Sequence, residues 1–67
     1  MISLKTLNQL IAWNSDRAAR CLEASANPEL TKKERRGYDW KRVQHQRTAG
    51  ALVDLREMIL EKQNGPE

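Results

Sequence analysis

The stretch NPELTKKE, residues 27–34, decides the fold because it ends one helical pattern and starts another. Asn27 stands before Pro28, which disfavours helical geometry in the preceding residue and has no backbone N–H to continue a helix. Beyond it, Thr31 and Glu34 have the spacing of a capping box, in which each side chain accepts a hydrogen bond from the other residue's backbone amide. We therefore predict that one helix stops at this point and that another begins at Thr31.

The residues before this stretch predict one amphipathic helix over residues 3–26. Ser3 is the expected N-cap, and Ile2 and Leu7 have the spacing of a hydrophobic staple around it. Apolar residues then recur at helical spacing along one seam, with neither proline nor glycine before the break. Asn14 falls on this seam, where a buried asparagine sets register or partner choice in coiled coils. A partly exposed end of the seam is the alternative explanation for this residue.

The residues after the stretch predict a second helix over residues 31–63, which Asn64-Gly65-Pro66 ends. Gly37 weakens the start of this helix, because glycine in a helix costs about 1 kcal/mol relative to alanine. Residues 31–36 therefore form either the first turns of the helix or a separate turn before a helix that begins near Tyr38.

Two long helices with so short a connection are antiparallel neighbours, so we predict an all-α fold with one domain, residues 1–67, arranged as a two-helix antiparallel hairpin. A chain of 67 residues buries only about 60% of its unfolded surface and needs reinforcement. Its single cysteine, Cys21, can form no internal disulfide, and its single histidine, His45, leaves no Cys/His cluster for a metal. Oligomerisation is the remaining means of reinforcement, and we expect a homodimeric four-helix bundle.

The second helix carries two apolar stripes, and the first helix can cover only one of them. We expect the first helix to cover the stripe that contains Tyr38 and His45, which leaves the other stripe for the dimer. Small residues beside Gly50 would let another helix approach closely, either the partner's or the first helix of the same chain. The residues predicted for the dimer interface are Val43, Gly50, Val53 and Leu60.

Positive charge is concentrated at the start of the second helix. Residues 32–47 contain seven Lys or Arg and two Asp or Glu, a local balance of +5, within a chain whose net charge is +3. Such a segment attracts an acidic partner, either a protein surface or a nucleic-acid backbone. A solvated helix face with no partner is the alternative interpretation.

Both tryptophans fall outside the apolar stripes, Trp13 opposite the seam of the first helix and Trp40 within the basic segment. Tryptophan, tyrosine and arginine are enriched at binding hot spots. We interpret Trp40 as a partner contact rather than a residue that packs within the chain, whereas a dimer can cover Trp13. The residues predicted to bind a partner are Arg36, Tyr38, Trp40, Arg42, Arg47 and Trp13.

The residue pattern gives no support for catalysis, and we expect a protein that is not an enzyme and uses no metal or cofactor. His45 has no neighbour in the sequence that could act as a nucleophile, and Cys21 falls on an apolar face. The sequence contains no glycine-rich phosphate-binding loop. No apolar run approaches the ~18 residues of a membrane span, and residues 1–13 do not form the apolar core of a secretory signal. We therefore expect a cytoplasmic protein.

By its size, its basic charge and its helical-hairpin pattern, the chain resembles small phage-encoded inhibitors of host proteins, including anti-quorum-sensing and anti-CRISPR proteins. The resemblance covers the whole chain but rests on no shared motif, so no residue role carries over. It implies a non-enzymatic regulator that sequesters a host protein, such as a transcription regulator or a motor ATPase. The chain is also similar in length and form to plasmid copy-number repressors of the Rop type, which implies an RNA- or DNA-binding four-helix dimer. A small secretion chaperone, which shields a helix of another protein, is the third interpretation.

Overall fold

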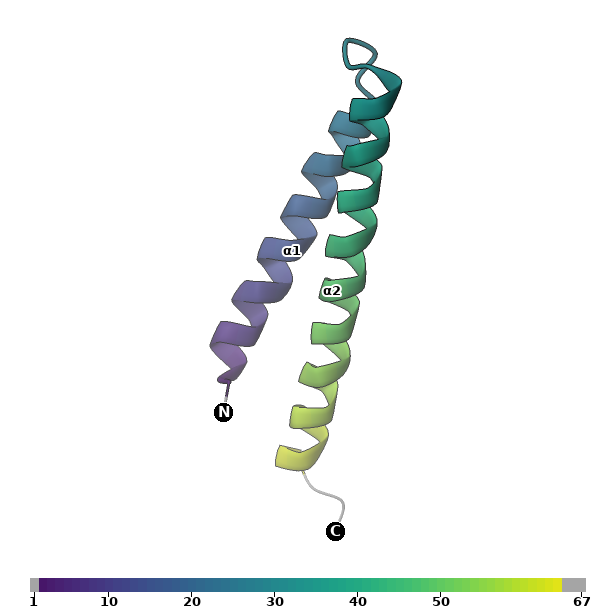
Figure 1. Cartoon of the computed structure of the whole chain (residues 1–67). Coiled ribbons are helices and arrows are strands. Elements are labelled where there is room, and N and C mark those ends of the chain that lie inside the picture. The colour runs from purple at the N-terminus through teal and green to yellow at the C-terminus, as the bar shows by residue number, and fades with distance from the viewer. Residues whose placement is uncertain (1, 65–67) are drawn as a thin grey trace.

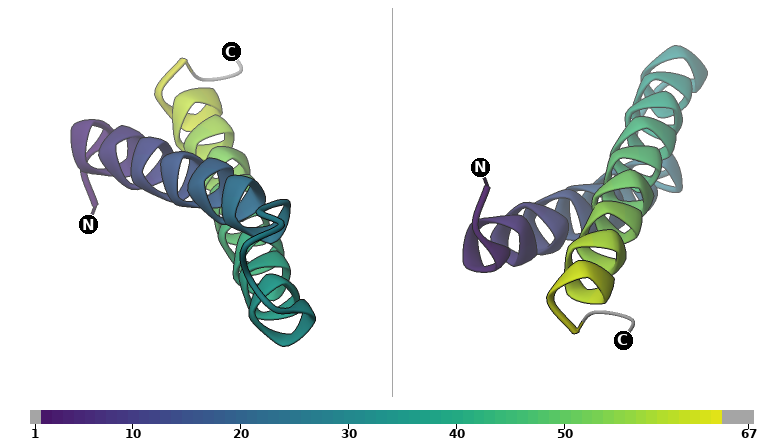
Figure 2. Two further views of the ribbon diagram at one scale, coloured as in Figure 1. Left: turned by 90° about the horizontal axis from the view of Figure 1, so that it is seen from above. Right: turned by 90° about the horizontal axis from the view of Figure 1, so that it is seen from below.

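The computed structural model describes residues 2–64 and consists of two helices joined by a short connection. Helix α1 spans Leu4–Ser25 and helix α2 spans Lys32–Asn64. The helices run antiparallel, close together beside the connection and further apart toward the two termini (Figure 1). Seen along the molecule, they cross at an angle (Figure 2). The molecule is a rod of 56 × 17 × 16 Å, and the predicted all-α hairpin is confirmed.

Helix α1 begins as the sequence predicts, with Ser3 as its N-cap. The backbone amide of Thr6 donates to Ser3 Oγ at 3.1 Å, and the amide of Leu7 donates to the Ser3 carbonyl oxygen at 2.9 Å. The first bond satisfies one of the four backbone N–H groups that a helix N-terminus leaves without a partner, and the second is the first bond of the helix itself. The helix starts one residue later and ends one residue earlier than the expected range of 3–26.

The connection between the helices is held by its own hydrogen bonds. Asn27 Oδ1 accepts from the amide of Glu29 at 2.9 Å, which closes a turn around Pro28. The capping box is confirmed, because the amide of Thr31 donates to Glu34 Oε1 at 3.0 Å and the amide of Glu34 donates to Thr31 Oγ1 at 3.1 Å. The bond from the Thr31 amide favours the carboxylate form and lowers the pKa of Glu34 below its ordinary value of 4.5.

Helix α2 is continuous through Gly37, so residues 32–36 are its first turns and not a separate turn. A Cβ added at Gly37 would meet no atom within 4 Å. Glycine is therefore required there neither by a close approach nor by a left-handed backbone. Gly65 and Pro66, which were expected to follow the end of this helix, lie outside the described residues.

The contact between the helices buries few side chains. Within residues 2–64, only Leu7, Asn14 and Ala18 are buried, and Leu7 alone is fully covered. The accessible surface is 5443 Å², whereas a compact protein of 7.7 kDa exposes about 4,300 Å². The hairpin is thus an open, elongated structure in which most apolar side chains keep part of their surface in water.

We expect the substitution Gly37→Ala to stabilise the hairpin by about 1 kcal/mol, because alanine loses less backbone entropy in a helix and finds open space at this position. Urea denaturation at one fixed protein concentration measures the change. The matched control is Ala12→Gly at an exposed position of α1, which should cost a similar amount. Loss of stability in Gly37→Ala would contradict a continuous, unstrained helix at this point.

Candidate functional site

The residues predicted to bind a partner do not form one surface, because they point to different sides of the hairpin. Helix α1 packs against the side of α2 that carries His45, which contacts Asn14. Trp40 precedes His45 by five residues, and five helical residues rotate a side chain by about 140°. Trp40 therefore faces away from α1. Its side chain is 65% exposed, more than any other large hydrophobic residue in the described part of the chain.

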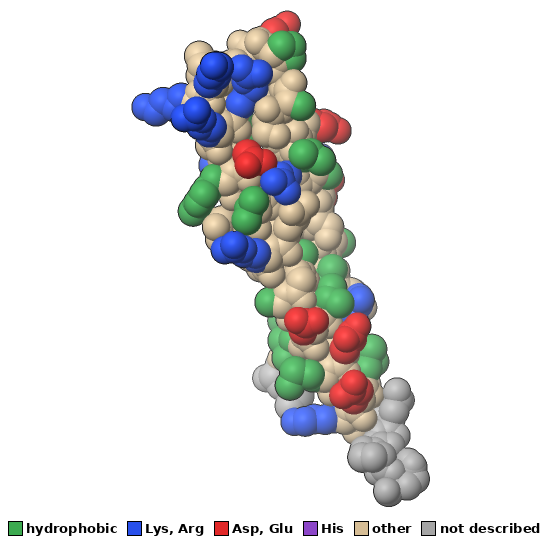
Figure 3. Space-filling view, turned by 90° about the vertical axis from the view of Figure 1, so that its right-hand side faces the viewer, with side chains coloured by type: hydrophobic (Ala, Val, Ile, Leu, Met, Phe, Trp, Pro, Cys, Tyr) green, Lys and Arg blue, Asp and Glu red, His purple; other side chains and the backbone are tan. Residues whose placement is uncertain are grey.

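Arg36 and Arg47 share this outward side of α2, because they lie four residues before and seven residues after Trp40. Both are exposed, and within residues 2–64 neither forms a hydrogen bond or an ion pair through its side chain. Basic side chains gather over the end of α2 nearest the connection, whereas acidic ones are seen toward both ends (Figure 3). We call this region the Trp40 surface; it consists of Arg36, Trp40, Val43 and Arg47.

Tyr38 and Arg42 are placed differently from the Trp40 surface. Tyr38 lies seven residues before His45, hence on the side toward α1, and is 37% exposed. Arg42 donates from Nε and Nη2 to Asp39 Oδ1 at 3.0 and 2.8 Å, and from Nη1 to Gln46 Oε1 at 2.8 Å. Its side chain is only 22% exposed. Arg42 therefore has fewer donors to offer a partner than the two free arginines of the Trp40 surface.

Trp13 does not lie opposite the seam of α1, as expected from the sequence, but beside the seam, where its indole reaches α2. Its ring meets His45 edge-on, with ring centroids 5.6 Å apart and an angle of 81° between the planes. The guanidinium carbon of Arg17 lies 5.1 Å from the centre of the indole, a cation–π geometry. The side chain is still 51% exposed, and it belongs to a different surface from Trp40.

A hydrogen bond between Asn14 and His45 links the helices inside their contact. Asn14 is 6% exposed, and its Nδ2 donates to the Leu10 carbonyl oxygen at 2.9 Å. The Leu10 carbonyl oxygen can only accept, so the amide nitrogen of Asn14 must be the atom that faces it. The amide oxygen of Asn14 then faces His45 Nδ1, which lies 3.0 Å away. His45 therefore carries a proton on Nδ1. His45 thus lies on the stripe that α1 covers, as the sequence predicts, and Asn14 occupies the buried position that a register-setting residue requires.

The residues predicted for the dimer interface divide between two sides of α2. Val43 is half-buried on the outward side near Trp40, and Gly50, seven residues later, is exposed there. A Cβ added at Gly50 would meet no atom within 4 Å. Val53 and Leu60 instead flank the contact with α1, where Val53 is half-buried and Leu60 is 38% exposed. The apolar stripe therefore drifts around the helix and does not form one straight line.

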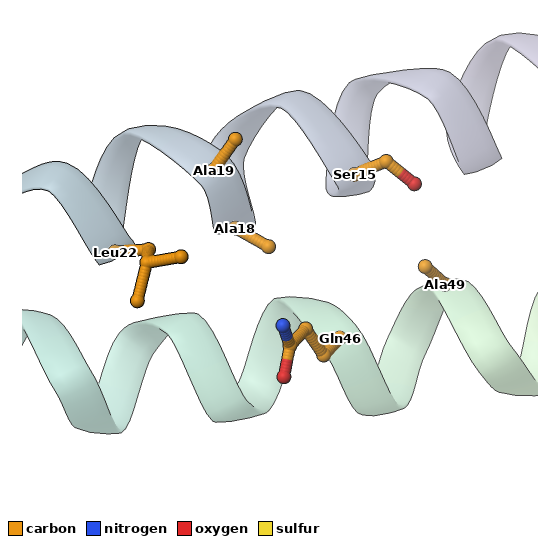
Figure 4. A pocket seen from close by; sticks show the side chains of 6 residues that line it. All are labelled: Ser15, Ala18, Ala19, Leu22, Gln46 and Ala49. Atoms are coloured by element: carbon orange, nitrogen blue, oxygen red, sulfur yellow. The ribbon is translucent and has the colours of Figure 1, made fainter.

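A shallow groove runs between the helices beside Val53. Ala49, one helical turn before Val53, lines this groove, which has a volume of about 320 Å³. Leu22 reaches the groove from α1 and points toward α2 (Figure 4), yet it is 52% exposed. The other lining residues are Ser15, Ala18, Ala19 and Gln46. We call this side of the hairpin the Val53 edge; it consists of Leu22, Ala49, Val53 and Leu60.

The remaining chemistry of the described residues is limited. Residues 2–64 bring together no group of three or more His, Cys, Asp or Glu side chains that would hold a metal ion. Cys21 is a half-buried free cysteine. Neither of the two described helices is long and apolar enough to cross a membrane. No family model matches the chain, and no curated protein or solved structure shows significant similarity to it.

The bond between Asn14 and His45 should contribute to the stability of the folded hairpin. Asn14→Leu should cost about 1–3 kcal/mol, because it leaves the His45 N–H without its partner in the contact. The double variant Asn14→Leu/His45→Leu should recover much of this loss, since replacing both polar partners with apolar ones can be nearly neutral. A double-mutant cycle by urea denaturation measures the coupling.

The matched control is Asn8→Leu, which removes the exposed bond from Arg56 Nη1 to Asn8 Oδ1, 2.8 Å long. Because water can replace that bond, the change should cost less than about 1 kcal/mol. If the Asn14 and His45 effects add to within about 0.5 kcal/mol, the two residues are not coupled and the proposed link between the helices is wrong.

Proposed function

We propose that this chain is a non-enzymatic regulator that binds another protein through the Trp40 surface and inhibits it by sequestration. The observation that carries the proposal is the 65% exposed indole of Trp40 between two exposed arginines, on the side of α2 that α1 does not cover. Tryptophan and arginine are the residues most enriched among binding hot spots. The partner surface that fits has an apolar pocket for the indole and carboxylates facing Arg36 and Arg47.

The resemblance to small phage-encoded inhibitors of host proteins supports the same proposal. Inhibition by sequestration needs only a contact surface, which a hairpin of 67 residues can supply. A host transcription regulator or a motor ATPase is the class of partner that this resemblance implies. The proposal places the protein in the cytoplasm, where a chain with one cysteine and no internal disulfide is typical.

A nucleic acid is the second candidate partner, and one observation favours it. Lys32 and Lys33 are exposed at the start of α2 and extend the positive charge of the Trp40 surface toward the connection. Phosphate contacts release counterions, so an RNA or DNA complex would weaken steeply as salt concentration rises. A protein complex anchored by the Trp40 indole would depend less on salt.

Truncation of Trp40 tests the proposed function. Trp40→Ala should keep its helical content by circular dichroism and weaken partner binding by about 2 kcal/mol or more, as expected for a hot-spot residue. The measurement is affinity capture from host lysate with and without nuclease, quantified by mass spectrometry, for the wild type and the variant. The matched control is Met58→Ala, another exposed apolar residue of α2 at 58% exposure, which should leave capture unchanged.

Two outcomes would contradict the proposal. If nuclease abolishes capture by the wild type, the partner is held through nucleic acid and the second candidate is favoured. If Trp40→Ala captures the partner as well as the wild type, the binding surface lies elsewhere on the hairpin.

The proposal also includes a homodimer formed through the Val53 edge. The accessible surface of the hairpin, 5443 Å², exceeds that of a compact protein of this mass by about 1,100 Å². Each partner in a standard interface buries about 800 Å². Two hairpins that pack their Val53 edges together would form a four-helix bundle and cover Leu22 and Leu60, and the Trp40 surface of each copy would remain exposed.

We expect Val53→Glu to dissociate the dimer, because a charge forced into an apolar contact without a partner costs several kcal/mol. Ala12→Glu introduces the same side chain at an exposed position of α1 and should leave association intact. Sedimentation equilibrium at micromolar concentrations measures both variants. A wild-type mass of 7.7 kDa would rule out the dimer, and equal dissociation by both variants would show that the Val53 edge is not its interface.

A further inference from the structure

Two apolar hollows lie on the opposite flank of the hairpin from the Val53 edge, and they share no lining residue. One hollow, of about 420 Å³, is lined by residues of α1 that include Leu10 and Trp13. The other, of about 430 Å³, is lined by Ile2 together with residues of α2 that include Leu55 and Ile59. We call these five residues the Trp13 groove: Ile2, Leu10, Trp13, Leu55 and Ile59.

Thr6, Leu10 and Trp13 have the spacing of one helix face. Ile2 lies before the start of α1 and lines the second hollow together with residues of α2. Ile2 lies against α2 beside Leu55, whereas Trp13 contacts His45. Seven residues separate Thr6 from Trp13 within α1, which at 1.5 Å per residue is about 10 Å, or two helical turns.

The groove is accessible and apolar. Trp13 is 51% exposed, and Leu10 and Leu55 are each 38% exposed. The Trp40 surface and the Val53 edge include none of these three side chains, so neither of the interactions proposed above would cover them. Exposed apolar side chains gathered on one flank mark a candidate interaction site in a protein of this size.

The charges at the rim of the Trp13 groove are positive. Arg17 lies over the Trp13 ring at one end, with its guanidinium carbon 5.1 Å from the ring centre. Lys62 lines the hollow at the other end. Among the described residues, no carboxylate lines either hollow. A second copy packed here by two-fold symmetry would bring Arg17 of one chain toward Lys62 of the other, and like charges would repel.

We infer that the Trp13 groove binds an acidic amphipathic helix of a partner protein. Two turns of such a helix, with apolar side chains at positions i, i+4 and i+7, match the length from Thr6 to Trp13. Glutamate or aspartate residues beside that apolar stripe pair with Arg17 and Lys62. This site is separate from the Trp40 surface and does not rest on the function proposed for that surface.

A defined peptide tests this inference. The chain has two tryptophans, so Trp40→Phe leaves Trp13 as the only fluorescent indole. The probe is a synthetic helix of about 14 residues, with leucine at positions i, i+4 and i+7 and glutamate at most others. Binding should shift the Trp13 emission to shorter wavelength, because the half-exposed indole loses water. The same peptide with lysine in place of glutamate should bind at least about tenfold more weakly.

Charge reversal in the protein separates groove binding from attraction to the basic segment. Arg17→Glu/Lys62→Glu should weaken the acidic peptide at least about tenfold and restore binding of the lysine peptide. In the Trp13→Phe variant, where Trp40 reports instead, the acidic peptide should leave the emission unchanged. The two emission signals therefore show whether the peptide binds at the Trp13 groove or at the Trp40 surface.

Three results would overturn the inference. The first is no shift of the Trp13 emission with either peptide, and the second is equal binding of the two peptides. The third is dissociation of a wild-type dimer by Leu10→Glu in sedimentation equilibrium, which would make a second copy of this chain the occupant of the groove.

Discussion

Two helices packed side by side cover only a narrow strip of each other, and in this chain the strip holds three buried side chains within residues 2–64. Leu7 and Ala18 supply its apolar contact, and Asn14 supplies its polar one. A third or fourth helix would cover the flanks of this strip, as in a bundle. Without one, aromatic and aliphatic residues on both flanks keep roughly a third to a half of their surface in water. The Val53 edge and the Trp13 groove follow from this one geometric constraint.

The sequence predicted the architecture because its signals are local. The Ser3 cap and the Thr31/Glu34 capping box depend on side chains that bond to backbone amides three residues away, and both were confirmed. The continuity of α2 through Gly37 could not be decided from sequence, because the cost of one glycine is comparable to the gain from the surrounding helix formers. The structure has one helix of 33 residues, which begins at the capping box.

The candidate site was harder to predict, because it depends on how far side chains reach and on which donors are already occupied. Trp13 was assigned to the outer side of α1, but an indole beside the seam is long enough to touch His45 on the facing helix. Arg42 was grouped with the other arginines, although Asp39 and Gln46 take three of its N–H donors. Sequence spacing shows both neighbours of Arg42, at three and four residues, so the i to i+3 rule was the signal that could have separated it from Arg36 and Arg47.

The connection between the helices, residues 26–31, has a kinetic consequence. A short turn that carries its own hydrogen bonds brings the two helices together without the entropic cost of closing a long loop. Helical proteins with mostly local contacts fold within microseconds to milliseconds. Two protein molecules at micromolar concentration meet productively only about 0.1 to 10 times per second, from typical association rate constants. The hairpin therefore folds in much less time than passes between two encounters. The rate at which it binds any other molecule is set by diffusion and orientation and not by the folding of the chain.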